Sequence, residues 1–134
     1  MIEHVKVLNE EVALIIRKIQ TQERVEFFTE PDDQLQIGAF DMKKGEKIQP
    51  HMHLENKRVL NTTAEVLIVQ KGILTVYFYL SELKEIVDQK FNLVEGDVIL
   101  LKSGIHGFEI TEDCKFIEIK QGPFKETADK IKLY

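Results

Sequence analysis

The chain has 134 residues, of which 43% are hydrophobic and 31% charged, the composition of one globular domain with an ordinary core. The 23 Asp and Glu residues outnumber the 18 Lys and Arg residues, and the net charge of −5 argues against binding nucleic acid through bulk charge. Its aliphatic runs are far shorter than the roughly 18 apolar residues that cross a bilayer, so we expect no membrane partner. Without a signal-peptide pattern, and with Cys114 as the single cysteine, we expect a cytoplasmic protein without an internal disulfide.

The first 30 residues contain an aliphatic run, 12–19, that fits either a buried strand or one face of a short helix. Its β-branched residues favour a strand, and we expect a second strand at 25–29.

Glycines and prolines divide the rest of the chain into short segments rich in β-branched and aromatic residues, which is typical of strands. The clearest predicted strands span residues 35–42, 64–70, 73–80, 97–101, 107–111 and 115–120. We expect 66–69 and 74–80 to form a hairpin across Lys71-Gly72. Residues 125–130 have helix-compatible side chains but are too few to define a helix. Short strands at this spacing predict an antiparallel sandwich or barrel.

Two of the four histidines, His51 and His53, are separated by one residue, so in a strand both imidazoles would point to the same side. Such a pair can clamp a metal ion, or it can simply face solvent. Upstream, Gly45 is followed by five residues and then His51; downstream, Glu65 is followed by six residues and then Gly72. This arrangement resembles the first motif of the cupin superfamily.

The second cupin motif is similar to residues 96–106, which begin at Gly96 and end with Gly104-Ile-His106. The resemblance implies one cupin domain over residues 1–134, with the first motif at about 45–72 and the second at about 96–106. The fold it implies is an all-β, cupin-like jelly-roll barrel of two antiparallel sheets. It further implies that His51, His53, Glu65 and His106 bind a divalent metal ion.

The sequence departs from the cupin pattern at two places. Eleven residues separate His53 from Glu65, where the family has three or four, so we expect a loop around 55–58 and Glu55 competes for the carboxylate position. We prefer Glu65, since its spacing to Gly72 matches and an inward carboxylate on an apolar strand needs a compensating partner.

In the second motif Lys102 replaces the usual proline, and one residue fewer separates Gly104 from His106. A slip of one residue in a regular strand reverses the side chain's face, but the glycines on both sides of His106, Gly104 and Gly107, allow the backbone to restore its direction.

Three imidazoles and a carboxylate hold a first-row divalent ion, whether iron, manganese, nickel, copper or zinc, and leave positions open for water or substrate. Around them, strand alternation places Leu67 and Val69 on the face of Glu65. Two candidate catalytic residues for proton transfer are Glu118, with a solvated charge as the alternative, and Tyr77, with packing as the alternative. The phenol of Tyr77 could also orient a polar substrate at the barrel mouth. Arg58 is the best candidate for binding an anionic group of a substrate.

We therefore expect a metal-dependent cupin enzyme that acts on a small polar molecule, with carbohydrate-type substrates suggested by the resemblance alone. The reaction could be oxygenation, isomerisation or epimerisation. The alternative is a non-catalytic cupin that binds a small, sugar-type ligand. The resemblance also implies a homodimer, for which the apolar N-terminal segments 5–8 and 12–19 could supply a shared sheet edge. His4 is expected to be a solvated surface residue.

Overall fold

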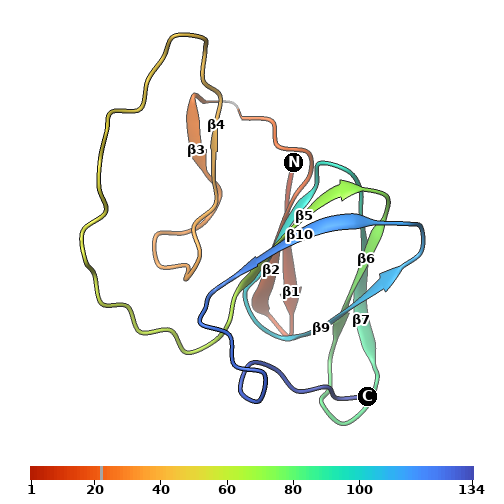
Figure 1. Ribbon diagram of the computed structural model, residues 1–134. Coiled ribbons are helices and arrows are strands. Elements are labelled where there is room, and N and C mark those ends of the chain that lie inside the picture. Colours follow the sequence, from red (N-terminus) through yellow and green to blue (C-terminus); the bar gives the residue numbers. More distant parts are fainter. Residues whose placement is uncertain (22) are drawn as a thin grey trace. The chain divides into compact units, whose positions relative to one another are not determined.

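The computed structural model describes residues 1–21 and 23–134, which divide into two compact units (Figure 1). Unit 1 comprises Met1–Ile19 and Thr62–Tyr134, and unit 2 comprises Gln20–Asn61. The described residues form strands and no helix, which confirms the predicted all-β class with antiparallel sheets. The strands of the described residues do not close into a barrel. Nor does this part of the chain contain any helix apolar and long enough to cross a membrane.

Unit 1 contains two antiparallel sheets. The larger has the strand order β1-β2-β8-β5-β10 and the smaller the order β7-β6-β9. The strands of the larger sheet are β1 (Ile2–Val7), β2 (Glu10–Ile16), β5 (Glu65–Lys71), β8 (Val98–Leu101) and β10 (Lys115–Lys120). Those of the smaller sheet are β6 (Leu74–Tyr79), β7 (Val87–Leu93) and β9 (Ile105–Ile110).

The hydrophobic core of unit 1 lies between these sheets and draws side chains from both. Its largest members include Leu67 on β5, Ile99 on β8 and Phe78 on β6, all 0% exposed. Because these strands are rich in Val, Ile, Leu and Phe at alternating positions, each sheet turns one apolar face to the other. Burying this face is the main contribution to the stability of unit 1.

The N-terminal segment is a hairpin, which confirms the strand prediction for residues 12–19 over its first five positions. Leu8 and Asn9 between β1 and β2 have φ angles of 51° and 68°, the left-handed conformation that two-residue hairpin turns require. On its other side β2 pairs with β8, so β1 forms the edge of the sheet. The homodimer expected at such an edge stays a prediction.

The prediction of a hairpin across Lys71-Gly72 is wrong. β5 already pairs with β8 on one side and β10 on the other, so β6 crosses to the smaller sheet instead. Gly72 permits this crossing because its φ is +79° and a Cβ there would lie 1.9 Å from the carbonyl oxygen of Asp113.

Strand β7 was not predicted, because three consecutive polar residues, 88–90, interrupt the apolar alternation of this edge strand. The other predicted strands are present with shifted ends, and β10 has the predicted bounds. The turn before β9 is made by Gly104 (φ +82°), and Gly107 lies within the regular strand. At the C-terminus, residues 125–129 form a single turn and no helix.

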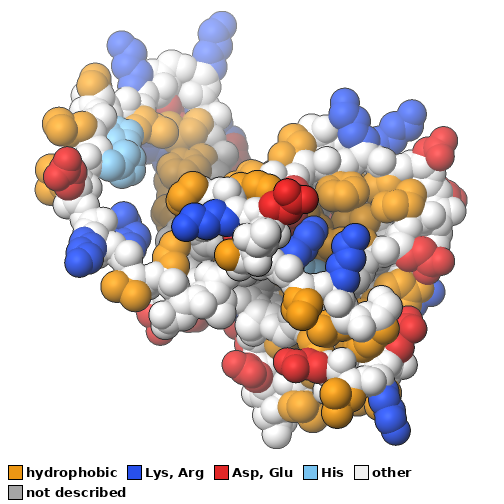
Figure 2. Space-filling view, turned by 60° about the horizontal axis from the view of Figure 1, so that its bottom comes forward, with side chains coloured by type: hydrophobic (Ala, Val, Ile, Leu, Met, Phe, Trp, Pro, Cys, Tyr) orange, Lys and Arg blue, Asp and Glu red, His pale blue; other side chains and the backbone are white. Residues whose placement is uncertain are grey.

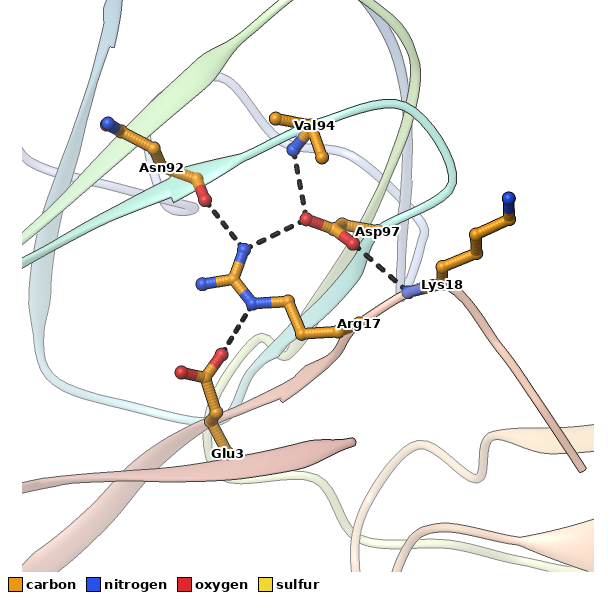
Figure 3. Close-up of polar contacts among 6 residues, drawn as sticks. All are labelled: Glu3, Arg17, Lys18, Asn92, Val94 and Asp97. Carbon is orange, nitrogen blue, oxygen red and sulfur yellow. Dashed lines mark hydrogen bonds and ion pairs between the residues drawn. The ribbon is translucent and has the colours of Figure 1, made fainter. Parts of the chain in front are cut away.

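A polar network joins the end of β2 to the start of β8 (Figure 3). Arg17 donates to Asp97 at 2.9 Å, to Glu3 at 2.6 Å and to the backbone carbonyl of Asn92 at 2.6 Å. Asp97, 2% exposed, also accepts hydrogen bonds from the backbone amides of Val94 and Lys18. The buried carboxylate is thus satisfied by a cation and two amides, as burial of a charge requires.

Unit 2 contains a short hairpin, β3 (Val25–Phe27) with β4 (Gly38–Phe40), in which the rings of Phe27 and Phe40 meet edge to face at 6.3 Å. β3 and β4 each lie within a longer predicted strand, 25–29 and 35–42. Residues 41–61 of this unit contain no strand, in agreement with the loop predicted around 55–58.

Candidate functional site

Glu65 and His106 meet in the interior of unit 1, and they come from different sheets. Glu65 is the first residue of β5 in the larger sheet, and His106 is the second residue of β9 in the smaller one. The Oε2 atom of Glu65 lies 3.7 Å from the Nε2 atom of His106. Their side chains are only 17% and 26% exposed, so each sits largely out of solvent beside the other.

Strand register explains why both side chains point inward. Glu65 shares its face of β5 with Leu67 and Val69, as alternation predicts, and both of these belong to the core. His106 pairs with Phe78, a fully buried core residue, and paired residues on antiparallel strands project from the same face. The two polar side chains therefore extend an otherwise apolar interior.

The surroundings of Glu65 favour its ionised form. The imidazole of His106 has the largest effect and lowers the pKa of Glu65; burial acts in the opposite direction. The charges of Lys120 and Lys130 also lower this pKa, which lies below the ordinary value of 4.5. Glu65 is thus a carboxylate at neutral pH, as a metal ligand or an ion-pair partner must be.

Two buried side-chain nitrogens among the described residues have no hydrogen-bond partner, Nδ1 of His106 and Nε2 of Gln121. Gln121 accepts a hydrogen bond through Oε1 from the amide of Ala64 at 2.7 Å, directly before Glu65. Because that acceptor must be the oxygen, the amide orientation is fixed and Nε2 is the free donor. Unsatisfied buried polar atoms are uncommon in proteins, and strain, a catalytic role or a bound water or ion accounts for them.

The geometry of Glu65 and His106 fits one shared metal ion. Carboxylate oxygens and imidazole nitrogens bind divalent transition metals at about 2.0–2.2 Å, so two ligands of one ion lie at most about 4.4 Å apart. The separation of 3.7 Å is within that limit. Among the described residues, however, no three His, Cys, Asp or Glu side chains come together as a metal-binding group.

His51 and His53 belong to unit 2, where the backbone at these positions is not a strand. Their rings contact each other edge to face, with centroids 5.4 Å apart, and Nδ1 of His51 lies 2.9 Å from the carbonyl oxygen of Gln49. Both side chains are exposed, and pale blue histidine rings are visible at the molecular surface in Figure 2. Of the four predicted ligands, His51 and His53 thus contact each other in unit 2. Glu65 and His106 lie together in unit 1.

The two proposed proton-transfer residues lie on different sides of the sheets. Glu118 on β10 pairs with Leu67 and so shares the inward face of Glu65, although its side chain is exposed at the sheet edge. Tyr77 pairs with Gly107, next to His106, and so projects from the opposite face of the smaller sheet. There its hydroxyl donates to Glu109 at 2.5 Å, which raises the pKa of the phenol.

The remaining candidates are at the surface. Arg58 and Glu55 are exposed residues of unit 2. His4 is exposed, as predicted, and its imidazole contacts the carboxylate of Glu11.

Sequence reasoning missed the contribution of the C-terminal segment, in which Gln121 binds the backbone at the start of β5 and the charge of Lys130 contributes to lowering the pKa of Glu65. Neither residue belongs to a recognisable motif, and only the three-dimensional fold relates them to Glu65.

Comparison with known proteins finds no matching family model, no similar curated protein and no similar solved structure.

Proposed function

We propose that the chain is a metal-dependent enzyme of cupin type that acts on a small polar molecule, with His51, His53, Glu65 and His106 as the metal ligands. The observation that carries the proposal is the approach of Glu65 and His106 to 3.7 Å from two different sheets. Both occupy motif positions, and both point into an apolar interior. The pairing of His51 with His53 in the ligand set rests on the motif spacing.

A bound divalent ion would supply Lewis-acid or redox chemistry at open coordination positions. The residues of the chain would contribute the rest. Glu65 would supply negative charge, His106 would bind through Nε2, and the apolar side chains of Leu67 and Phe78 would exclude water. Glu118 shares the inward face of β5 and β10 with Glu65 and is our candidate for moving a proton. A jelly-roll arrangement and a carbohydrate-type substrate belong to the same proposal, on the basis of the cupin resemblance.

The alternative is a non-catalytic cupin that binds a small, sugar-type ligand. The position of Tyr77 favours it, because this residue lies on the opposite face of the smaller sheet from His106 and is engaged with Glu109. An enzyme needs a proton-transfer group within reach of the substrate, whereas a binding protein does not. Glu118 is then the only one of the two proton-transfer candidates on the inward side.

Elemental analysis tests the metal proposal. Protein purified without a tag or chelator should contain close to one equivalent of iron, manganese, nickel, copper or zinc, and the His106→Ala and Glu65→Gln variants should lose it. His4→Ala is the matched control, since this histidine is exposed at 59% and outside the proposed set. Protein that is metal-free and takes up none of these ions would refute the ligand assignment.

Reaction class is tested on the metal-loaded protein with a panel of monosaccharides and sugar acids. An isomerase or epimerase should incorporate solvent deuterium at carbon, detected by NMR, and an oxygenase should consume dioxygen. If the NMR lines of one sugar broaden specifically in the presence of the protein and neither reaction occurs, the non-catalytic binding protein is favoured. Glu118→Gln should slow turnover, and Tyr77→Phe should leave it unchanged.

A further inference from the structure

The C-terminal segment, residues 121–134, runs from one sheet of unit 1 to the other. It begins after Lys120, the last residue of β10 in the larger sheet. At its far end the hydroxyl of Tyr134 donates to the carbonyl oxygen of Ser81 at 2.7 Å, and its ring meets that of Tyr79 edge to face at 5.6 Å. Tyr79 ends β6 in the smaller sheet, so the segment crosses one end of the unit, as its dark blue trace shows in Figure 1.

This is the end of unit 1 that holds Glu65 and His106. Glu65 pairs directly with Lys120, where the segment begins. His106 pairs with Phe78, the neighbour of Tyr79, where the segment is attached. The segment thus begins beside Glu65 on the larger sheet and ends on the smaller sheet next to the strand partner of His106, where it is attached on the outer face that Tyr79 shares with Tyr77.

Contacts along the segment keep it near this end. The ammonium group of Lys120 lies over the ring of Phe124, 5.2 Å from its centroid. Residues 125–129 form one turn, in which the carbonyl of Lys125 accepts from the amides of Ala128 and Asp129 at 3.1 Å. The charge of Lys130, farther along, contributes to lowering the pKa of Glu65.

We propose that residues 121–134 form a strap that closes the end of unit 1 over Glu65 and His106, and that the contacts of Tyr134 hold it closed. The attachment is weak: Tyr134 is 54% exposed, and among the described residues it is held by one hydrogen bond and one ring contact. A strap held this way opens by a local fluctuation without unfolding the sheets. Its role in admitting a substrate rests on the metal-dependent function proposed above, whereas the closure itself does not.

The test measures how fast diethyl pyrocarbonate acylates His106 in metal-free protein, followed by peptide mass spectrometry. Tyr134→Phe removes the hydrogen bond to Ser81 and keeps the ring, so the rate at His106 should rise about fivefold, the effect of one ordinary hydrogen bond. Tyr134→Ala removes both contacts, and the rate should rise further.

His4, which is 59% exposed, is the reference within the same molecule, and its rate should not change in either variant. Lys132→Ala is the matched control, since it alters an exposed residue of the same segment. Circular dichroism establishes that each variant is folded. An unchanged rate at His106 in both folded Tyr134 variants would overturn the strap.

This labelling experiment separates the two proposals, because it uses no metal. If the protein binds no metal but the Tyr134 substitutions raise the labelling rate at His106, the strap is supported and the metal-dependent function is refuted. Normal metal content with labelling that is insensitive to Tyr134 refutes the strap alone.

Discussion

Arg17 and Asp97 form an ion pair at 2.9 Å between the end of β2 and the start of β8, across 80 residues of sequence. The carboxylate of Asp97 is 2% exposed, while the guanidinium also reaches Glu3 on β1. One side chain thus ties three segments of the larger sheet together, and it supplies the counter-ion that, with two backbone amides, offsets the cost of burying Asp97.

Replacing Arg17 with alanine should therefore destabilise unit 1 by about 2–4 kcal/mol, since it leaves a buried carboxylate without its counter-ion. Urea unfolding of the wild type and the variant gives this difference. The matched control is Lys43→Ala, which removes an exposed ion pair with Asp41 at 3.4 Å and should change stability by less than about 0.5 kcal/mol. Equal effects of the two substitutions would contradict the assigned role of Arg17.

Glu11 should make a pH-dependent contribution to stability. Burial raises its pKa, but hydrogen bonds from Lys102, at 2.7 Å, and from His4 together outweigh burial and leave the pKa below 4.5. A carboxylate whose pKa is lower in the folded state stabilises the fold above its unfolded pKa, and the contribution is lost as the pH falls through the folded value. Glu11→Gln should therefore cost about 1 kcal/mol at pH 7 and much less at pH 3.

Urea unfolding at the two pH values measures this effect, with Glu10→Gln on the exposed neighbouring residue as the control. If Glu11→Gln has the same cost at pH 3 and pH 7, the ion pairs of Glu11 do not contribute.

Gly72→Ala should be strongly destabilising. An added Cβ would lie 1.9 Å from the carbonyl oxygen of Asp113 and would sit on a backbone with φ of +79°, so both a clash and a strained conformation result. We expect a loss of more than about 3 kcal/mol in thermal or urea unfolding. Gly96→Ala is the control, because φ at Gly96 is +90° and an added Cβ would meet only a flexible lysine side chain at 3.5 Å. This variant therefore measures the cost of the backbone conformation alone, about 1–2 kcal/mol. Similar losses at both sites would show that the close approach of Asp113 is unimportant.

The hydrogen bond from Tyr77 to Glu109 should be visible in the titration of the tyrosines. It raises the pKa of Tyr77, because the carboxylate accepts the phenol proton's hydrogen bond and disfavours ionisation. In Glu109→Gln, the absorbance change at alkaline pH that belongs to Tyr77 should therefore shift to lower pH. Tyr77→Phe in the Glu109→Gln background identifies that component among the three tyrosines. An unchanged titration curve would mean that the two side chains do not interact in solution.

Local sequence features predicted much of the fold, and long-range pairing accounts for what they missed. The bounds of β10 were predicted correctly from residues 115–120, because apolar residues within this segment indicate a strand without reference to its neighbours. The hairpin across Gly72 failed because both sides of β5 are taken by β8 and β10, which turn residues do not encode. β7 was missed because the polar side chains of this edge strand hide its periodicity.

The candidate site likewise has residues that the sequence predicted and one that it did not. Motif spacing selected Glu65 and His106, and the register of β5 and β9 turns both side chains inward. Gln121, by contrast, has no motif, and its free amide nitrogen follows from a hydrogen bond to the backbone of Ala64. Such a role depends on distant parts of the chain meeting, which one sequence does not reveal.

The strand order of the larger sheet has a consequence for synthesis on the ribosome. The N-terminal hairpin finds its neighbour only in β8, and the sheet is finished only when β10 is made. Until then the nascent chain carries Ala13 and Ile15, side chains destined for the core, on a hairpin whose β2 edge is unpaired. The edge of β2 is therefore sheltered only after β8 has been made, and slow non-local closure of the sheet is the expected final step of folding.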